Sequence, residues 1–187
     1  MKIALTGAHG VGKTTLLNAL QKKLGAHSST VVCREVPRVI ASVVGSDTFF
    51  RRGENTPLRQ FLILFYQIIE EGLKEDEAEI VLADRTVVDH LAYTITLFPE
   101  LVATPEYQAL FTGIRSWLPK YDLIIKLPIE FAAVDDGVRE ADDIFQEEID
   151  QAIDQLYAQL GITPEEVRGS VEQRAEAVMR QISALER

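Results

Sequence analysis

The stretch that decides the fold is Gly7-Ala8-His9-Gly10-Val11-Gly12-Lys13-Thr14-Thr15. It matches the pattern G-x-x-x-x-G-K-[ST], in which glycines let successive backbone N–H groups curl around a phosphate. The Lys13 ammonium then reaches the β- and γ-phosphate oxygens, and the Thr14 hydroxyl is offered to Mg²⁺. His9 stands at a variable position, so we expect its backbone to bind and not its ring. We predict that the whole stretch forms a phosphate-binding loop.

The flanks of this loop support the prediction. Residues 2–6 form a short apolar run that is typical of a buried first strand. After the loop, Leu16, Leu17, Leu20 and Leu24 recur at helical spacing. The loop therefore opens a helix whose N-terminal dipole favours an anion, which a glycine-rich turn without a ligand would not require.

Length and composition set the outer limits. The chain has 187 residues, of which 47% are hydrophobic and 26% charged, and these values predict one globular domain spanning residues 1–187. The net charge of −10 disfavours nucleic acid and anionic membrane surfaces and favours a small-molecule partner. No apolar stretch approaches the length of a membrane span and no secretory signal precedes the first strand, so we expect a cytoplasmic protein without membrane contact.

The single cysteine, Cys33, excludes a disulfide within the chain. It lies in the apolar run 30–33, which predicts a small buried side chain without chemistry of its own.

Short β-rich runs alternate with longer helical runs along the chain, which is the pattern of an α/β fold. Strands are predicted at residues 2–6, 30–35, 79–84 and 121–127, with a weaker candidate at 165–168. Helices are predicted at residues 15–24, 57–74, 107–117, 141–160 and 170–185, and another begins near Thr86. We therefore expect a three-layer P-loop NTPase fold, with a four- to five-stranded parallel sheet, helices on both faces and a small lid.

Polar side chains follow two of the predicted strands, where ligands bind in parallel α/β sheets. Glu35 ends the second strand, where a carboxylate can accept the proton of an attacking hydroxyl or cap the start of a following helix. Asp84 ends the third strand, the usual place for a second magnesium-organising group beside a phosphate loop. Arg85 can bridge Glu35 to the substrate hydroxyl or a phosphate, or form an ion pair that only orders the turn. Asp89 points toward the same crevice or serves as a helix N-terminal charge.

A polar loop at residues 132–143 follows the fourth strand and leads into a long amphipathic helix. We expect it to act as a lid in which Gly137 gives freedom to hinge. Arg139 is the candidate cation that closes over ATP and neutralises the transferred phosphoryl group.

Four motifs together resemble the deoxynucleoside kinase and nucleoside monophosphate kinase group of P-loop enzymes: Gly7–Thr15, Arg34-Glu35, Asp84-Arg85-Thr86 and Asp136-Gly137-Val138-Arg139. The sequence looks most like bacterial "AAA domain" ATP-binding proteins related to nicotinamide riboside kinase. The resemblance covers nearly the whole chain, and residues 169–174 are similar to the segment that passes the adenine in such kinases.

The resemblance implies phosphoryl transfer from ATP and Mg²⁺ to a hydroxyl of a nucleoside-like acceptor. It assigns these roles: Lys13 neutralises phosphates, Thr14 and Asp84 organise Mg²⁺, Glu35 is the base, Arg85 holds the acceptor end, and Arg139 comes from the lid. Asp89 is a further candidate for binding the acceptor, from its place in the sequence. Gln67, after Tyr66, resembles the residue with which deoxynucleoside kinases read a base, since its amide pairs with a donor and an acceptor.

From the residues alone, the same helix carries an apolar stripe that predicts core packing: Phe61, Leu64, Phe65 and Ile68.

Two other functions stay open at this point. One is a regulatory ATPase that switches a partner and phosphorylates no small molecule. The other is a polynucleotide 5′-hydroxyl kinase, for which Arg51, Arg52 and Arg59 would form a local basic track. The single lid arginine suits an uncharged acceptor better than a nucleoside monophosphate, whose phosphate needs cationic partners. The sequence also leaves a homodimer open.

Overall fold

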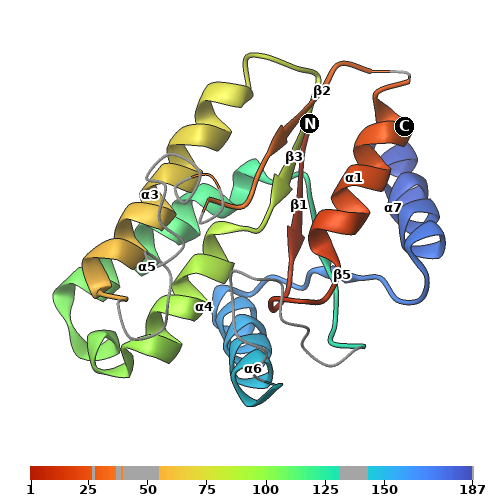
Figure 1. Cartoon of the computed structure of the whole chain (residues 1–187). Coiled ribbons are helices and arrows are strands. Elements are labelled where there is room, and N and C mark those ends of the chain that lie inside the picture. Colours follow the sequence, from red (N-terminus) through yellow and green to blue (C-terminus); the bar gives the residue numbers. More distant parts are fainter. Residues whose placement is uncertain (27, 37–38, 40–54, 131–142, 187) are drawn as a thin grey trace.

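The computed structural model describes residues 1–26, 28–36, 39, 55–130 and 143–186 (Figure 1). Its sheet has five strands in the order β2 (Thr30–Cys33), β3 (Ile80–Asp84), β1 (Lys2–Thr6), β4 (Leu123–Lys126) and β5 (Glu165–Glu166). All neighbouring strands pair in parallel. The predicted parallel sheet is confirmed in its five-stranded form. The second strand ends at Cys33, two residues earlier than predicted, so Glu35 lies two residues beyond its end.

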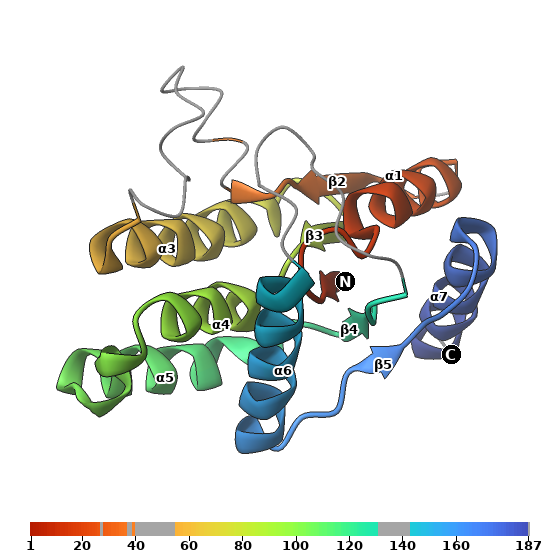
Figure 2. The ribbon, with the colours of Figure 1, turned by 60° about the horizontal axis from the view of Figure 1, so that its bottom comes forward.

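Helices cover both faces of this sheet. On one face lie α1 (Lys13–Leu24) and α7 (Val171–Leu185), and on the other lie α3 (Pro57–Lys74), α4 (Val87–Leu97) and α6 (Asp143–Leu160) (Figure 2). On the side of α3 and α4, the chain adds α5 (Pro105–Trp117) and the short 3₁₀ helices η3 (Pro99–Ala103) and η4 (Leu118–Lys120). The arrangement is the expected three-layer P-loop fold. None of the helices in the described ranges is both long and apolar enough to span a membrane.

Capping side chains fix where several helices begin. Thr56 accepts a hydrogen bond from the Arg59 N–H at the start of α3, and Thr104 does the same for Tyr107 at the start of α5. Thr86 and Asp89 form a reciprocal capping box at the start of α4. These caps satisfy N–H groups that the first helical turn leaves without partners.

The strand order places the site. Because β1 lies between β3 and β4 while β2 lies beyond β3, the chain reverses direction across the sheet at β1. Ligands bind at the carboxyl ends of strands beside such a reversal. The register pairs Leu5 with Asp84, and the Arg85 N–H donates to the Leu5 carbonyl over 3.0 Å. The segments after β1 and β3 therefore meet at one edge of the sheet.

The apolar stripe predicted on the 57–74 helix is only partly a core stripe. Leu64 is buried, but 49% of Phe65 is exposed. The buried face of α3 instead carries Gln60, Ile63, Leu64, Gln67 and Glu71. Periodicity identifies an apolar face but not the side on which the rest of the molecule lies, and here the inner side is occupied by a polar network.

Candidate active site

The loop after β1 has the backbone that its glycines predict. Gly7, Gly10 and Gly12 all have positive φ angles, of 138°, 78° and 92°. At Gly7 a Cβ atom would lie 2.5 Å from the Leu127 carbonyl oxygen, so a side chain is excluded on two grounds. Gly12 is the N-cap residue of α1, and no side chain makes a capping hydrogen bond there. The first turn of α1 contains no acidic residue. The N-terminus of α1 is therefore suited to an anion.

Lys13 folds back into this loop. Its Nζ donates to the carbonyl oxygens of Gly7 over 2.8 Å and Ala8 over 2.5 Å. Burial, and then the nearby Arg85 cation, lower the pKa of Lys13 to about 7, against the opposing effect of the surrounding carboxylates. An anion in the loop would offset this loss of hydration, so the lysine is placed to meet a phosphate.

Thr14 and Asp84 are in direct contact. The Thr14 hydroxyl donates to Oδ2 of Asp84 over 2.7 Å. Burial raises the pKa of Asp84, while the Lys13 cation opposes the rise. A hydroxyl and a carboxylate are the hard oxygen donors that Mg²⁺ prefers, so the pair fits this ion. In the described part of the chain no group of three or more His, Cys, Asp or Glu side chains is placed to hold a metal.

Glu35 and Arg85 form a buried ion pair. Nε and Nη2 of Arg85 each lie 2.8 Å from Oε1 of Glu35, and both side chains are at least 95% buried. The Arg85 guanidinium also lies over the Tyr93 ring, 5.0 Å from its centroid. Its Nη1 is buried, makes no hydrogen bond among the residues that the structure describes, and lies 3.7 Å from Oδ1 of Asp89 as an ion pair. The structure thus brings together three of the predicted site residues, and Nη1 of Arg85 still lacks a hydrogen bond within the described residues.

Asp89 anchors the phosphate loop to α4. Its Oδ1 accepts from the Gly7 N–H over 3.0 Å, and its Oδ2 accepts from the hydroxyls of Thr6 and Thr86 over 2.8 and 2.6 Å. Oδ2 also accepts from the Thr86 N–H. The helix-start role is confirmed. Its role toward an acceptor stays a prediction, and the fully buried carboxylate already serves these donors.

Gln67 is fully buried on the inner face of α3. Its Nε2 donates to Oε1 of Glu71 over 2.6 Å and to the Arg85 carbonyl over 3.3 Å. Its Oε1 lies 3.4 Å from Nε2 of His90. Gln67 is therefore next to Arg85, but its amide is bonded inside the protein, and its role toward a base stays a prediction.

Several residues at this site carry no local sequence signal. His9 Nδ1 lies 3.1 Å from the Tyr93 hydroxyl, and the Gln146 amide donates to the His9 carbonyl over 2.6 Å. Phe145 lies against both the His9 and Tyr93 rings, at centroid distances of 5.8 and 6.0 Å. These contacts join α4 and α6 to the phosphate loop. They arise only from tertiary packing, so no spacing in the sequence could have found them.

Arg174 supports the loop from α7. Its Nη1 donates to the Val11 carbonyl over 2.9 Å, and its Nη2 pairs with Glu130. Glu130 also accepts from the Gly169 N–H. The 169–174 segment, which the resemblance places beside the adenine, therefore touches the phosphate loop.

Part of the predicted site lies outside the described residues. This holds for Arg139, for Gly137 and the lid up to residue 142, and for Arg51 and Arg52. Asp143 is the first residue of α6.

Comparison with known proteins identifies a family for the chain and structures that share its fold. The family model described as "AAA domain" matches residues 2–174. No curated protein matches the chain by sequence.

Solved structures share the fold at low identity. Deoxyadenosine kinase from M. mycoides with bound dATP is 17% identical, with a TM-score of 0.63 and coverage of 98% of this chain and 99% of that chain. The structure of the same enzyme with dCMP and dCDP bound is 16% identical, with a TM-score of 0.66, and the match covers 98% of this chain and 100% of that chain. The NadR protein in complex with NAD and AMP-PNP is 15% identical, with a TM-score of 0.68. That match covers 98% of this chain but only 49% of the NadR chain. The phosphate loop, the five-stranded order and the family match together show that the chain belongs to the AAA domain family of P-loop proteins.

Proposed function

We propose that the chain is a kinase that transfers the γ-phosphoryl group of ATP to a hydroxyl of a small nucleoside-like acceptor. The observation that carries this proposal is the buried Glu35–Arg85 pair beside the phosphate loop. A switch ATPase presents the γ-phosphate only to water. A carboxylate fixed by a guanidinium, with a further N–H left over, is suited to orient a hydroxyl of a second substrate.

The phosphate side of the site uses the loop and its neighbours. Backbone N–H groups of residues 7–15 and the Lys13 ammonium would bind the phosphates. Thr14 and Asp84 would hold Mg²⁺, which neutralises phosphate charge when bound.

On the acceptor side, the hydroxyl oxygen forms a bond to the γ-phosphorus while the bond to the β–γ bridging oxygen breaks and ADP leaves. The hydroxyl proton passes to the Glu35 carboxylate. Nη1 of Arg85 would donate to the acceptor or to the transferred group. Arg139 is proposed as the lid cation. These parts mainly position the reactants and stabilise charge, which is what phosphoryl transfer demands of a protein.

The structural neighbours support a nucleoside-like acceptor, because one is a deoxyadenosine kinase and the other was solved with NAD and AMP-PNP. If Gln67 binds the acceptor's base through its amide, that amide must first break its hydrogen bonds to Glu71 and to the Arg85 carbonyl.

An acceptor panel tests the proposal. ADP release is measured with deoxynucleosides, ribonucleosides, nicotinamide riboside, a 5′-hydroxyl oligonucleotide and no acceptor. We expect one of the nucleoside-like compounds to accelerate release. The same slow rate with every addition would point to a switch ATPase, and acceleration by the oligonucleotide alone would point to a polynucleotide kinase.

Glu35→Gln tests the role of the carboxylate. We expect acceptor-dependent kcat to fall by about 100- to 10,000-fold, with ATP affinity by calorimetry retained. Glu77→Gln, at an exposed glutamate, is the matched control. Unchanged turnover in Glu35→Gln would remove Glu35 as the base.

A further inference from the structure

Two peptide bonds of the phosphate loop come directly before a glycine with positive φ. They join His9 to Gly10, where φ is 78°, and Val11 to Gly12, where φ is 92°. Because glycine populates positive and negative φ about equally, a peptide before it can rotate by about 180° at little cost. The glycine pattern therefore permits the N–H groups of Gly10 and Gly12 to face a phosphate, but it does not hold them there.

Two buried side chains from outside the loop hold the carbonyl groups of these peptides. Nε2 of Gln146, the fourth residue of α6, donates to the His9 carbonyl over 2.6 Å. Nη1 of Arg174, in α7, donates to the Val11 carbonyl over 2.9 Å. Gln146 is 1% exposed and Arg174 is 3% exposed. Solvent therefore does not compete for either hydrogen bond.

The planar peptide passes this constraint to its N–H group. The described residues contain no cis peptide bond, so the N–H of each bond points away from its carbonyl. With the two carbonyls held toward α6 and α7, the N–H groups of Gly10 and Gly12 are turned to the opposite side. Gly10 is exposed and Gly12 is half-buried, and neither N–H donates a hydrogen bond within the described residues. Both N–H groups are therefore open to an anion.

Arg174 is itself anchored. Its Nη2 pairs with Glu130, which also accepts from the Gly169 N–H over 3.2 Å. The hydrogen bond from Arg174 lowers the pKa of Glu130, so the carboxylate is charged at neutral pH. One planar guanidinium thus connects the loop carbonyl to a fixed carboxylate, which a single ammonium group does not reproduce.

We propose that Gln146 and Arg174 are positioning residues for the polyphosphate of the nucleotide. By holding the two loop carbonyls, they turn the N–H groups of Gly10 and Gly12 toward the phosphates. The proposal rests on nucleotide binding in the proposed function, and it adds two residues from outside the sequence motif. It also gives Arg174 a role on the phosphate side, whereas the resemblance places residues 169–174 beside the adenine.

Inorganic tripolyphosphate tests the proposal, because it has the phosphates of ATP but no adenine. Calorimetry measures the affinity of the full chain for each compound in the presence of Mg²⁺. We expect Gln146→Met and Arg174→Met each to weaken tripolyphosphate and ATP by the same factor, about 10-fold, since a phosphate-facing N–H loses its fixed direction. Gln151→Met and Arg180→Met, at exposed positions of the same helices, are the matched controls.

The two compounds separate the phosphate side from the adenine side. If Arg174→Met loses affinity for ATP but not for tripolyphosphate, Arg174 acts at the adenine and its positioning role is overturned. Unchanged affinity for both compounds in either variant overturns the proposal for that residue.

A double variant separates positioning from charge. Arg174→Met leaves the Glu130 carboxylate unpaired near the loop, where it would repel phosphates by itself. Adding Glu130→Gln removes this charge but returns no donor to the Val11 carbonyl. We expect the double variant to bind tripolyphosphate at least about 5-fold more weakly than Glu130→Gln alone. Equal affinity of these two proteins would show that only charge matters and would overturn the positioning role of Arg174.

Amide resonances report on the two peptides separately. In the wild type with isotope-labelled glycine, tripolyphosphate should shift the Gly10 and Gly12 N–H resonances downfield as hydrogen bonds to an anion form. Gln146→Met should reduce the shift at Gly10 more than at Gly12, and Arg174→Met should do the reverse. Equal losses at both glycines in both variants would indicate a general change of the fold and overturn the proposal.

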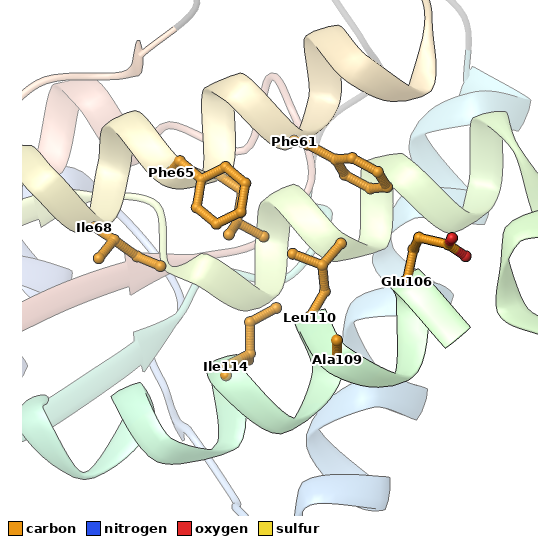
Figure 3. Close-up of a pocket in the computed structure, with 9 residues that line it drawn as sticks. Phe61, Phe65, Ile68, Glu106, Ala109, Leu110 and Ile114 are labelled. Atoms are coloured by element: carbon orange, nitrogen blue, oxygen red, sulfur yellow. The ribbon is translucent and has the colours of Figure 1, made fainter. Parts of the chain in front are cut away.

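A control for stability comes from the apolar pocket of about 340 Å³ between α3 and α5 (Figure 3). Ile114 lines this pocket together with Phe65 and Ile68, and the lining residues all belong to these two helices. Ile114→Ala should lower the thermal midpoint of unfolding and leave tripolyphosphate affinity unchanged. If it weakens tripolyphosphate as much as the methionine variants do, affinity follows stability and the proposal is overturned.

If the methionine variants fail to fold, Gln146→Asn and Arg174→Lys take their place. Each keeps the polarity or charge of the side chain but ends one bond short of the loop carbonyl. Wild-type tripolyphosphate affinity in both variants overturns the proposal.

All of these experiments measure binding and not transfer. A chain that binds ATP but phosphorylates no acceptor would fail the proposed function and leave this inference standing. A wild type that binds neither ATP nor tripolyphosphate overturns both.

Discussion

At the scale of single residues, Arg85 is held in a conformation that side chains rarely adopt. Its φ angle of 101° makes it the one non-glycine residue with positive φ in the described ranges. Such backbone costs about 1–3 kcal/mol and persists only where the surroundings impose it. Here the surroundings are Glu35, which takes two N–H groups of the guanidinium, and the Tyr93 ring. The strain places a fork of donors at the carboxyl end of β3.

Arg85→Lys keeps the positive charge but loses the planar set of guanidinium N–H donors. We expect kcat/KM for the acceptor to fall roughly 10- to 100-fold while ATP affinity changes little, because an ammonium cannot hold Glu35 by two N–H groups and also reach a substrate. Steady-state kinetics and calorimetry measure the two effects. Arg180→Lys, at an exposed position of α7, is the control. A variant with wild-type kcat/KM would show that the fork is not used.

Burial raises the pKa of Cys33 from 9.0 to about 12. Because the unfolded thiol ionises near pH 9 and the folded thiol does not, rising pH favours the unfolded chain between these values. We expect the free energy of unfolding of the wild type, relative to Cys33→Ala, to be constant up to about pH 8. Above pH 9 it should fall by about 1.4 kcal/mol per pH unit. Urea unfolding at pH 7, 8 and 10 measures the difference. A constant difference through pH 10 would contradict the account.

At the scale of elements, the capping box of α4 also shapes the phosphate loop. One carboxylate, that of Asp89, caps α4 through Thr86 and receives the Gly7 N–H at the first residue of the loop. The start of α4 and the end of β1 are therefore joined at one side chain.

Asp89→Asn keeps the size of the side chain but replaces an acceptor oxygen with an amide donor. At least one of the N–H or O–H groups that faced the carboxylate then meets another donor. We expect the free energy of unfolding to fall by about 2–3 kcal/mol and ATP binding to weaken, because a loop N–H loses its fixed position. Urea unfolding and calorimetry measure both, with Asp76→Asn at an exposed position as the control. Wild-type stability and ATP affinity together would contradict the anchoring role.

Elements with strong local signals were predictable. The phosphate loop and the apolar runs of β1, β3 and β4 lie where the sequence placed them to within two residues, and α4 and α7 begin next to the predicted residues 86 and 170. Which face of α3 turns toward the rest of the molecule was not predictable. Its apolar residues repeat at helical spacing, but the pattern does not reveal that Gln67 and Glu71 face inward. The donors to Glu71 come from β1, α5 and the segment before β4, and Gln67 meets the Arg85 carbonyl and His90, so distant parts of the chain decide the orientation.

At the scale of the whole molecule, Glu71 joins four parts of the chain. Its buried carboxylate accepts from Lys2 over 3.2 Å, Gln67 over 2.6 Å, Trp117 over 3.0 Å and Tyr121 over 2.9 Å. Lys2 also lies over the Trp117 ring, 4.7 Å from its centroid. This network ties β1, α3, α5 and the approach to β4 together, and through Gln67 it reaches the Arg85 carbonyl.

Glu71→Leu should lower the free energy of unfolding by about 3–5 kcal/mol, because three neutral donors lose their shared acceptor and the buried Lys2 ammonium is left with Glu75 as its ion-pair partner. Lys2→Met combined with Glu71→Leu should be more stable than Glu71→Leu alone, since a buried charge that has lost one of its two carboxylates is removed. Urea unfolding of the three proteins measures this. A Glu71→Leu variant as stable as the wild type would contradict the role of the network.

The sequence predicted the site residues that lie at the strand ends, but not the residues that reach the phosphate loop from the helices. Glu35 and Asp84 end predicted strands and Arg85 follows one of them. Parallel strands bring their carboxyl ends to one edge, so the meeting of these residues follows from topology. Tyr93, Gln146 and Arg174 reach the loop from helices whose packing no local pattern encodes.

The most direct test of the central claim follows the γ-phosphate itself. The chain is incubated with Mg²⁺, ATP labelled at the γ-phosphate and a nucleoside-like acceptor that accelerates ADP release, or each member of the panel in turn if none does. The products are then separated. The account predicts that the label appears in a phosphate ester of the acceptor, in amounts equal to the ADP formed, and that Glu35→Gln abolishes this ester. Label found only as free phosphate with every acceptor would contradict the account.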